Sequence, residues 1–516
     1  LKGLSHVIAG SVSPDSYLLS EKNLERMEEA LQLLKEDRRA WRIFSDAGRE
    51  RQIKNLADEM KDFLLEEENL VEEKADRFST EALETINSRL IRIKDIAWGL
   101  EKDLLENISR VRELSQTSDL SEEGFRVYAH VNYLLNCLNR LEVRGRDSAG
   151  IQITLSFEDH GSLEKITASL RERGLFEHFL ERNGGGDLVN GSIRLSCADP
   201  ARPVFMTFTY KTASVIGELG RNVRELRGII KSDEIFKAFV LGGPTPCSSM
   251  AHTRWASVGS ITEENCHPVN NFVLTDRVPG IEAVPPAGMC DAPLSVGIRD
   301  CMAVVKHYPR YGGGNWSINV VLNGDIDNYA TLRNDLETEE RRLIAPELTT
   351  DTKVIPLEIE KYLLRGHDLE AAFRLAVNDF EGSHAIAMTS DLEPGKAFLA
   401  LKGSGQSIYL GLCRDKYIYA SELYGLVEVT PYFLKMDGDS QGRQDTGGQI
   451  LILGQAPEGG LAGVRALHYD GTPISLSEED VRRAEITTRD IDRGGYRHYF
   501  LKEISESPLS VRKTLR

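Results

Sequence analysis

The sequence predicts an α+β fold in packed layers that is joined to a long helical segment. Residues 16–114 are rich in Glu, Lys, Arg and Leu and nearly free of Pro and Gly, which is typical of helices. After Gly150 the pattern changes to short alternations of apolar and polar residues, which are typical of strands. Helical stretches such as 213–230 and 369–378 lie between these strands without strict alternation, which favours a mixed fold over a repeated βαβ order.

The helical segment carries a heptad pattern near its end. One apolar residue recurs at every seventh position, namely Leu83, Leu90, Ala97, Leu104 and Val111. The interleaved apolar set consists of Ile86, Ile93, Leu100 and Leu114. Asn107 is the polar interruption of this seam. The spacing predicts a long antiparallel helical pair or a small bundle, which could serve as a structural spacer or as a docking surface for a partner helix.

The next helix and five strands are predicted from local signals. Ser121 is expected to cap a helix that runs through Leu141. The clearest strand predictions cover residues 151–155, 204–208, 318–322, 385–388 and 450–453. The Gly-rich pieces at 184–186, 312–314 and 403–405 are not followed by the Lys-Ser or Lys-Thr of a phosphate-binding loop. We therefore expect plain turns and insertion loops there.

Composition and charge argue against several classes of partner. The chain has 516 residues, with 63 Lys and Arg against 80 Asp and Glu, so its formal net charge is −17. This balance gives no electrostatic reason to bind nucleic acid or an anionic membrane surface. No apolar run approaches the roughly 20 residues that span a bilayer, and the first residues lack a secretory signal, so a cytoplasmic location is expected.

Cysteine and metal-ligand spacing give no sign of a metal or disulfide site. The seven cysteines form no CxxC pair and are interpreted as reduced thiols. No cluster of side chains has metal-ligand spacing, so neither a metal nor an organic cofactor is expected.

Four segments place polar, charged and Gly residues where core residues would otherwise be expected. They are 141–150 (LEVRGRDSAG), 251–259 (AHTRWASVG) with 265–268 (NCHP), 320–329 (VVLNGDIDNY) and 349–352 (TTDT). In the same order they resemble the patterns LEYRGYDSAG, AHTRWATHG, HNGIIENY and TDTE. Those patterns mark the glutaminase half of the glutamine:fructose-6-phosphate amidotransferase family, which are class II glutamine amidotransferases of the N-terminal-nucleophile type. Residues 420–430 (ASELYGLVEVT) and 495–504 (GYRHYFLKEI) resemble the stretches that lead toward the sugar-handling domains of that family.

The resemblance implies a four-layer αββα glutaminase fold and a domain order. Residues 1–11 would be the start of the first glutaminase helix, and residues 12–124 would be an all-α, coiled-coil-like insertion. The glutaminase domain would cover residues 125–480, with insertions at about 158–203 and 272–315. Residues 481–516 would be a linker toward sugar isomerase domains.

The resemblance also implies a reaction and partners. L-glutamine would be hydrolysed to glutamate through a γ-glutamyl thioester. The ammonia would pass to fructose 6-phosphate to make glucosamine 6-phosphate in amino sugar biosynthesis. The sugar isomerase domains of the same polypeptide would receive the ammonia and would form a homodimer.

Four residues match the central positions of the family site. Asn323 and Gly324 match its oxyanion hole, which needs a side-chain amide and a backbone N–H that a Gly leaves open to the substrate. Without the neighbouring motifs this pair would be interpreted as a turn. Arg254 matches the arginine that forks onto the substrate α-carboxylate, and Asp351 matches the carboxylate that receives the α-ammonium. The alternative is an Arg–Asp pair that ties two loops together.

Five further residues match supporting positions. Trp255 matches an aromatic residue that shields the site and the ammonia path, and Ser257 matches a threonine whose hydroxyl touches the substrate. Arg144 and Gly145 fall on the turn beside the nucleophile, where they would position the site. His267 matches the His-Pro of the family, with a structural loop histidine as an equal alternative.

The chain departs from the family pattern at several positions. Val258 stands where the family has a histidine that lines the site, so recognition of the substrate head group is expected to be altered. Lys353 replaces the Glu of TDTE, and Leu322 replaces the His of HNG. The family nucleophile is an N-terminal Cys, whereas position 1 is Leu1. We expect that Cys to lie upstream and the chain by itself to be inactive.

Two alternative functions stay open. One is an amidotransferase that acts on a different phosphosugar or on a keto-sugar. The other is a catalytically dead glutaminase-like module in which the helical segment is a docking element.

Overall fold

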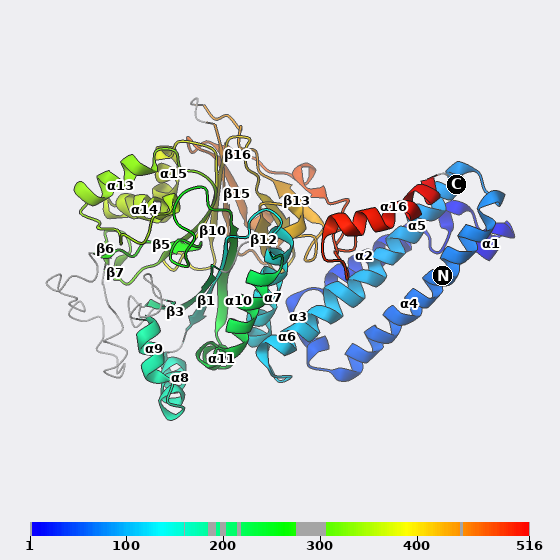
Figure 1. The fold of residues 1–516 in the computed structure, drawn as a ribbon, viewed down its shortest axis with the longest axis horizontal. Coiled ribbons are helices and arrows are strands. Elements are labelled where there is room, and N and C mark those ends of the chain that lie inside the picture. Colours follow the sequence, from blue (N-terminus) through cyan, green and yellow to red (C-terminus); the bar gives the residue numbers. More distant parts are fainter. Residues whose placement is uncertain are drawn as a thin grey trace. The chain divides into compact units, whose positions relative to one another are not determined.

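The computed structural model describes residues 3–158, 160–183, 192–196, 203–213, 218–274, 306–443 and 447–514. The chain divides into two compact units. Unit 1 comprises Leu1–Arg110, Val427–Pro431 and Ala484–Arg516, and unit 2 comprises Val111–Leu426 and Tyr432–Arg483. Unit 1 is helical and unit 2 combines helices with sheets (Figure 1), so the predicted mixture of helix and strand is confirmed. The predicted turn at 184–186 and much of the predicted insertions at 158–203 and 272–315 lie outside the described residues.

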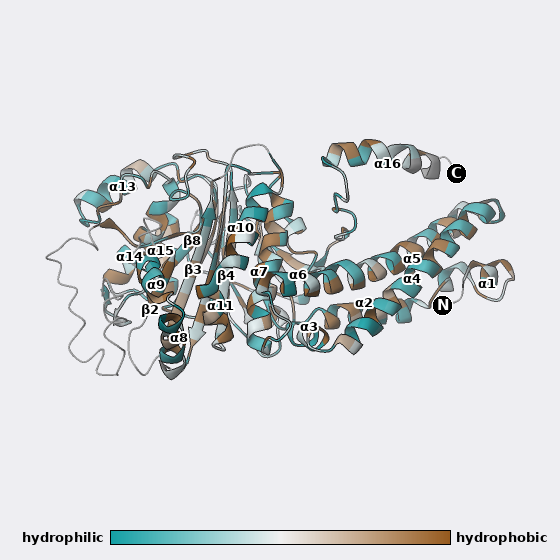
Figure 2. Cartoon of the chain, turned by 60° about the horizontal axis from the view of Figure 1, so that its bottom comes forward, coloured by the Kyte–Doolittle hydropathy of each residue, from teal (hydrophilic) through white to brown (hydrophobic). Residues whose placement is uncertain are grey.

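Helices account for most of unit 1, as the sequence predicts. They are α1 (Leu4–Ile8), α2 (Glu21–Leu34), α3 (Asp37–Phe44), α4 (Ala47–Lys74), α5 (Thr80–Trp98), a π-helical stretch (Gly99–Glu106) and α16 (Tyr499–Thr514), while α6 (Asn107–Ser115) crosses the unit boundary. Short side chains cap the two longest helices of this unit: Asp46 accepts from the backbone N–H of Gly48 at the start of α4, and Ser79 accepts from the backbone N–H of Ala82 at the start of α5. In Figure 2 apolar and polar residues alternate along α4 and α5, as expected for helices with one buried face.

Most of the predicted seam lies in unit 1 and is buried, and its last residues, Val111 and Leu114, are buried members of unit 2. The buried members of the seam are Ile86, Leu90, Ile93, Ala97, Leu100, Leu104, Val111 and Leu114. Helix α5 and the π-helical stretch that follows both contact α4 and α2, so the expectation of a small helical bundle is confirmed. Asn107 is buried as well, because its Nδ2 donates to the Asp103 carbonyl (2.8 Å) and to Glu428 Oε1 (2.7 Å). The polar interruption of the seam is therefore a satisfied core residue.

A buried ion pair joins distant parts of the chain within unit 1. Lys35 Nζ lies 2.9 Å from Asp103 Oδ2 and donates to the Glu428 carbonyl at 2.8 Å. Asp103 Oδ1 accepts from Thr488 Oγ1 at 2.7 Å. The segments around residues 428 and 488 thus belong to the core of the helical unit, in agreement with the grouping of Val427–Pro431 and Ala484–Arg516 with unit 1.

Unit 2 contains two large antiparallel sheets. The first has the order β2-β3-β1-β4, with β1 (Ser148–Phe157), β2 (Ile193–Ser196), β3 (Val204–Thr212) and β4 (Thr245–Arg254). The second has the order β16-β15-β14-β10-β9-β8-β5, with β5 (Val269–Asn270), β8 (Ile318–Gly324), β9 (His384–Ser390), β10 (Ala397–Lys402), β14 (Gln449–Leu453), β15 (Val464–His468) and β16 (Pro473–Ile474). All five predicted strands are confirmed as β1, β3, β8, β9 and β14.

Two smaller sheets complete the strands of unit 2. They are β12-β11-β13-β17, with β11 (Tyr409–Leu412), β12 (Tyr417–Ala420), β13 (Tyr432–Lys435) and β17 (Arg482–Arg483), and the pair β6 (Lys306–Tyr308) and β7 (Gly312–Gly314).

The helices of unit 2 are α7 (Glu122–Leu141), α8 (His160–Glu172), α9 (Phe176–Asn183), α10 (Arg221–Ser232), α11 (Glu234–Leu241), α13 (Tyr329–Thr338), α14 (Val354–Leu364) and α15 (Leu369–Asp379). The Ser121 cap of α7 is confirmed, because its side chain accepts from the backbone N–H of Gly124. The predicted start of a helix at residue 213 is wrong. Helix α10 begins at Arg221, since Gly220 before it takes the left-handed φ of 80° and interrupts the helical backbone.

Each of the two large sheets packs against helices, and a further core cluster contains Met250 of the first sheet together with residues of the second sheet. Phe208 of β3 packs edge-on against Phe236 and Phe239 of α11, with ring centroids 5.1 and 5.6 Å apart. On the second sheet, Phe398 of β10 packs against Phe373 of α15 at 5.6 Å, within a cluster that also includes α14. Between the sheets, Gln152 Nε2 of β1 donates to Asn319 Oδ1 of β8 at 3.0 Å.

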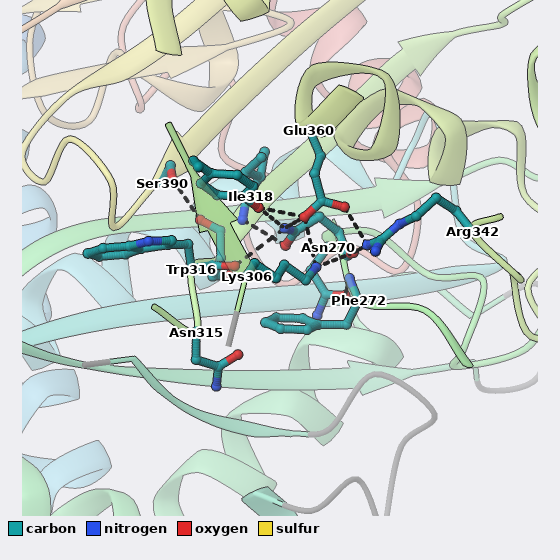
Figure 3. A network of polar contacts seen from close by, with 12 residues as sticks. Asn270, Phe272, Lys306, Asn315, Trp316, Ile318, Arg342, Glu360 and Ser390 are labelled. Carbon is teal, nitrogen blue, oxygen red and sulfur yellow. Dashed lines mark hydrogen bonds and ion pairs between the residues drawn. The ribbon is translucent and has the colours of Figure 1, made fainter. Parts of the chain in front are cut away.

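A second buried polar network lies beside the second sheet (Figure 3). Glu360 of α14 accepts from Asn271 Nδ2 at 2.9 Å and pairs with Lys306 Nζ at 2.8 Å. Burial opposes the ionisation of Glu360, but the charges of Lys306 and Arg342 outweigh it and lower the pKa of this carboxyl. The network links Asn271 to Lys306, two residues at either end of a long stretch of sequence.

Candidate active site

Three chain segments converge where β4 and β8 end and where α14 begins. The loop after β4 is tied to the turn before α14, because the Ser260 N–H donates to Thr349 Oγ1 at 3.0 Å. The segment after β8 is tied to the same turn, because the Ile326 N–H donates to Asp351 Oδ2 at 3.0 Å. The Ser257 hydroxyl donates to Asp325 and so joins the loop after β4 to the segment after β8. These contacts join three of the four motif segments found in the sequence, and the fourth, 141–150, lies against the end of β4.

Arg254 is the last residue of β4 and is only 4% exposed. Its Nη1 donates to the Ser260 carbonyl at 3.0 Å, and its Nη2 donates to the Val258 carbonyl. Burial lowers the pKa of the guanidinium from its ordinary value, while the charge of Asp351 opposes this shift. Arg254 thus holds its own loop in place and supplies a positive charge beside Asp351.

Asp351 begins the short turn Asp351–Lys353 that leads into α14 and is 5% exposed. Its Oδ1 accepts from the Thr352 N–H at 2.7 Å. Burial raises the pKa of Asp351, the backbone donors of Ile326 and Thr352 oppose the rise, and the negative charge of Asp325 adds to it. A carboxylate in this position is suited to receive a cationic group.

Asn323 and Gly324 form the end of β8, where they pair with Ala385 and His384 of β9. Gly324 has a φ of 106°, and a Cβ atom there would lie 2.3 Å from the Ser383 carbonyl oxygen. Among the described residues the Asn323 carboxamide has no hydrogen-bond partner, so its N–H donors are available to a ligand. A free amide beside a Gly at a strand end is an arrangement that can stabilise an oxyanion.

Replacing Gly324 by alanine is expected to lower the free energy of unfolding of unit 2. The loss should exceed the cost of a non-Gly residue in the left-handed region, which is about 1–2 kcal/mol. The reason is that the new methyl group also meets the Ser383 carbonyl. Gly395→Ala is the matched control, because Gly395 also has a positive φ of 76° but has nothing within 4 Å of the place that its new methyl group would take. Urea unfolding of both variants measures the difference, and equal losses would contradict the steric argument.

The turn before β1 lies against the backbone of Arg254. A Cβ atom on Gly145 would lie 2.9 Å from the carbonyl carbon of Arg254, and the Gly145 carbonyl accepts from the Thr253 hydroxyl. Arg144 is exposed and forms an ion pair with Glu422. Gly145 therefore lies at the site, whereas the Arg144 side chain is directed to Glu422.

The other predicted residues divide between surface and core. Trp255 is 75% exposed, so its ring projects into solvent from the loop after β4. His267 is buried, with Nε2 2.7 Å from Thr352 Oγ1 and with Nδ1 as acceptor of the Leu322 N–H at 3.5 Å. Burial first, and the nearby positive charge of Arg254 in addition, hold the pKa of His267 well below its usual value. His267 thus links β8 to the Asp351 turn.

Sequence reasoning missed two residues that shape the site. Asn265 is fully buried, and its Oδ1 accepts from the backbone N–H groups of Thr349 (2.7 Å) and Thr350 (2.9 Å). Asp147 Oδ2 accepts from the Ala256 N–H at 2.9 Å and so fixes the loop after Arg254. Both residues lie inside the motif segments, and this position is the one feature of the sequence that could have pointed to them.

The departures from the family pattern have local explanations. Lys353 is fully buried, and its Nζ donates to the carbonyls of Asn270 (2.5 Å) and Phe272 (2.6 Å) rather than to the site. Leu322 belongs to the core of the second sheet. Val258 contributes its carbonyl to Arg254, and its aliphatic side chain offers no polar group.

Neither a metal cluster nor a membrane span is found among the described residues. No group of three or more His, Cys, Asp or Glu in that part of the chain could hold a metal ion. No helix there is long and apolar enough to cross a membrane.

Comparison with known proteins identifies relatives of the chain. No protein-family model matches it. It is 30% identical to the glutamine–fructose-6-phosphate aminotransferase (isomerizing) of Methanothermobacter thermautotrophicus. This match covers 285 residues, which are 55% of this chain and 37% of the relative. Enzymes of the same name from Aeropyrum pernix (28% identity, 51% of this chain, 34% of the relative) and Acidithiobacillus ferridurans (28%, 56% and 37%) are also similar. The matches thus span little more than a third of these relatives' length.

Two solved structures show a weaker likeness. One is an allosteric regulatory enzyme of purine biosynthesis, with a TM-score of 0.35 and 15% identity over 65% of this chain and 46% of that chain. The other is the glutamine phosphoribosylpyrophosphate amidotransferase from B. subtilis complexed with ADP and GMP, with a TM-score of 0.32 and 16% identity over 62% of this chain and 49% of that chain.

Proposed function

We propose that this chain is the glutamine-hydrolysing half of an amidotransferase that supplies ammonia to fructose 6-phosphate to make glucosamine 6-phosphate. The observation that carries the proposal is the convergence of Arg254, Asp351 and the Asn323–Gly324 strand end at one place. The relatives named glutamine–fructose-6-phosphate aminotransferase, matched over about half of the chain, support the same assignment.

Each group has a role in amide hydrolysis. Arg254 binds the α-carboxylate of L-glutamine, and Asp351 accepts a hydrogen bond from its α-ammonium group. When a thiolate attacks the carboxamide carbon, the carbonyl oxygen becomes an oxyanion. The Asn323 amide and the Gly324 N–H donate to this oxygen. When the tetrahedral intermediate collapses, its C–N bond breaks and the nitrogen leaves as ammonia after taking up a proton from the α-amine of the nucleophile, and water then hydrolyses the γ-glutamyl thioester to glutamate and the free thiol. The reactive thiol is an N-terminal Cys in this proposal.

The neighbouring residues position these groups. Gly145, Asn265 and His267 hold the loops against one another, and Ser257 lies beside the head group. Arg144 and Trp255 stand at the rim. Trp255 closes over bound substrate and the ammonia path in this account.

The proposal extends to the fold and to partners. The two large sheets of unit 2, with α7 and α10 beside the first and α14 and α15 beside the second, form a four-layer αββα glutaminase domain. The helical unit is an insertion into that domain. Sugar isomerase domains of the same polypeptide receive the ammonia and form a homodimer in the cytoplasm.

Nitrogen transfer from labelled glutamine tests the proposed function. The natural protein is incubated with fructose 6-phosphate and glutamine that carries ¹⁵N in its amide, and the products are read by mass spectrometry. We expect ¹⁵N in glucosamine 6-phosphate. Label in a different amino sugar would overturn the acceptor and support the alternative phosphosugar. Absence of glutamine breakdown would overturn the glutaminase and support the dead module.

A further inference from the structure

Asp325 is an acidic residue at the candidate site that the family pattern does not contain. It follows Gly324 directly, where the family sequence HNGIIENY has an isoleucine. Its Oδ1 accepts a hydrogen bond from the Ser257 hydroxyl, so it joins the segment after β8 to the loop after Arg254. Among the described residues its second carboxylate oxygen has no hydrogen-bond partner.

Asp325 and Asp351 place two negative charges on the side of the site where the substrate ammonium would lie, and Arg254, which also faces Asp147, carries the positive charge. Asp325 directly precedes Ile326, whose backbone N–H donates to Asp351 Oδ2 at 3.0 Å, and the negative charge of Asp325 helps to raise the pKa of that buried carboxyl. Of the basic residues in these segments, Arg254 faces Asp351. Lys353 does not, because its Nζ donates to the carbonyls of Asn270 and Phe272. Two carboxylates that repel each other favour a ligand whose cation lies between them.

The acidic pair also stands beside a lost polar group. Val258 replaces a site-lining histidine of the family and lies next to Ser257, the residue that holds Asp325. The loss of one polar contact to the head group and the gain of a carboxylate thus occur in adjacent loops.

We propose that Asp325 is a specificity-determining residue, which binds the α-ammonium group of the substrate together with Asp351 and makes the site selective for amides of free α-amino acids. The inference rests on the proposed glutaminase function. Arg254 fixes the α-carboxylate on one side, and the two aspartates fix the ammonium on the other. Ser257 keeps the Asp325 carboxylate turned toward its loop. A substrate without the ammonium group leaves both carboxylates unneutralised.

The substitution Asp325→Asn tests this role, because it removes the charge but keeps an oxygen that accepts from Ser257. Hydrolysis by the natural protein is measured with L-glutamine and with 5-amino-5-oxopentanoate, which is glutamine without its α-amino group. We expect kcat/KM for L-glutamine to fall about tenfold or more, the value of one hydrogen bond to a charged group. The fall should come through KM. The value for the desamino amide should stay within about twofold.

Asp327→Asn is the matched control, since Asp327 lies two residues further along the same loop, is exposed, and undergoes the same change of charge. It should leave both substrates unchanged. Equal losses with both amides in Asp325→Asn would mean that Asp325 only holds the loop, and no loss would mean that it has no role. Either result overturns the inference while the glutaminase stands. If the unaltered protein hydrolyses neither amide, the proposed function itself is wrong and this inference with it.

Discussion

The substitution Asn323→Ala is expected to lower kcat for glutamine hydrolysis in the natural protein by about 10²–10³-fold, the usual cost of removing one oxyanion donor. The Asn323 carboxamide lies at the end of β8 and is free to donate to the oxygen that becomes negative in the transition state. That interaction is stronger in the transition state than in the bound substrate. KM should therefore change little.

Two further variants separate this role from a loss of structure. Asn323→Asp keeps the size of the side chain but replaces the donor by an acceptor, so it should be at least as inactive as the alanine variant. Asn334→Ala, in the exposed part of α13, should leave kcat unchanged. Steady-state kinetics of ammonia release provide the measurement. A loss of less than about threefold in Asn323→Ala would remove Asn323 from the oxyanion hole.

The second large effect concerns the stability of the helical unit. Asp103→Ala is expected to lower the free energy of unfolding of unit 1 by about 3–5 kcal/mol, because it leaves Lys35 buried without its carboxylate. Asp103 also accepts from Thr488, so the segment around that residue should loosen as well. Urea unfolding, with hydrogen exchange of the α5 amides, measures both consequences.

Two controls show whether burial is the cause. Lys102→Ala removes an ion pair to Glu106 whose side chains are 40% and 34% exposed. Its loss should cost only about 0.3–0.5 kcal/mol. The double variant Lys35→Met, Asp103→Leu removes both charges together and should recover most of the stability lost in Asp103→Ala. A large loss in the double variant would mean that the charges stabilise the bundle beyond their pairing.

Sequence patterns predicted the elements whose signals are local. The heptad seam around Leu90 and Ile93, the cap at Ser121 and the alternating strands such as 318–322 follow from spacing alone, and the structure confirms them. The start of α10 was misplaced because the left-handed conformation of Gly220, which stops the helix, depends on its surroundings.

Contacts between distant residues could not be predicted in the same way. Glu428 and Thr488 complete the core of the helical unit, but each is separated by hundreds of residues from the helices it joins. The position of Asn265 inside a motif segment does not reveal its role, because its Oδ1 accepts from two N–H groups that belong to residues 349 and 350. The motif residues Arg254, Gly324 and Asp351 were found through resemblance, and the three segments that carry them lie together in the structure.

Release of ammonia from L-glutamine by the natural protein tests the central claim most directly. Glutamate and ammonia are quantified together over a range of glutamine concentrations, with D-glutamine and a thiol-blocked sample beside them. We predict equal amounts of glutamate and ammonia, saturation with L-glutamine, and loss of the reaction after the thiol is blocked. Ammonia release no faster than the spontaneous reaction, from a folded protein with L-glutamine in excess, would contradict the assignment of this site as a glutaminase.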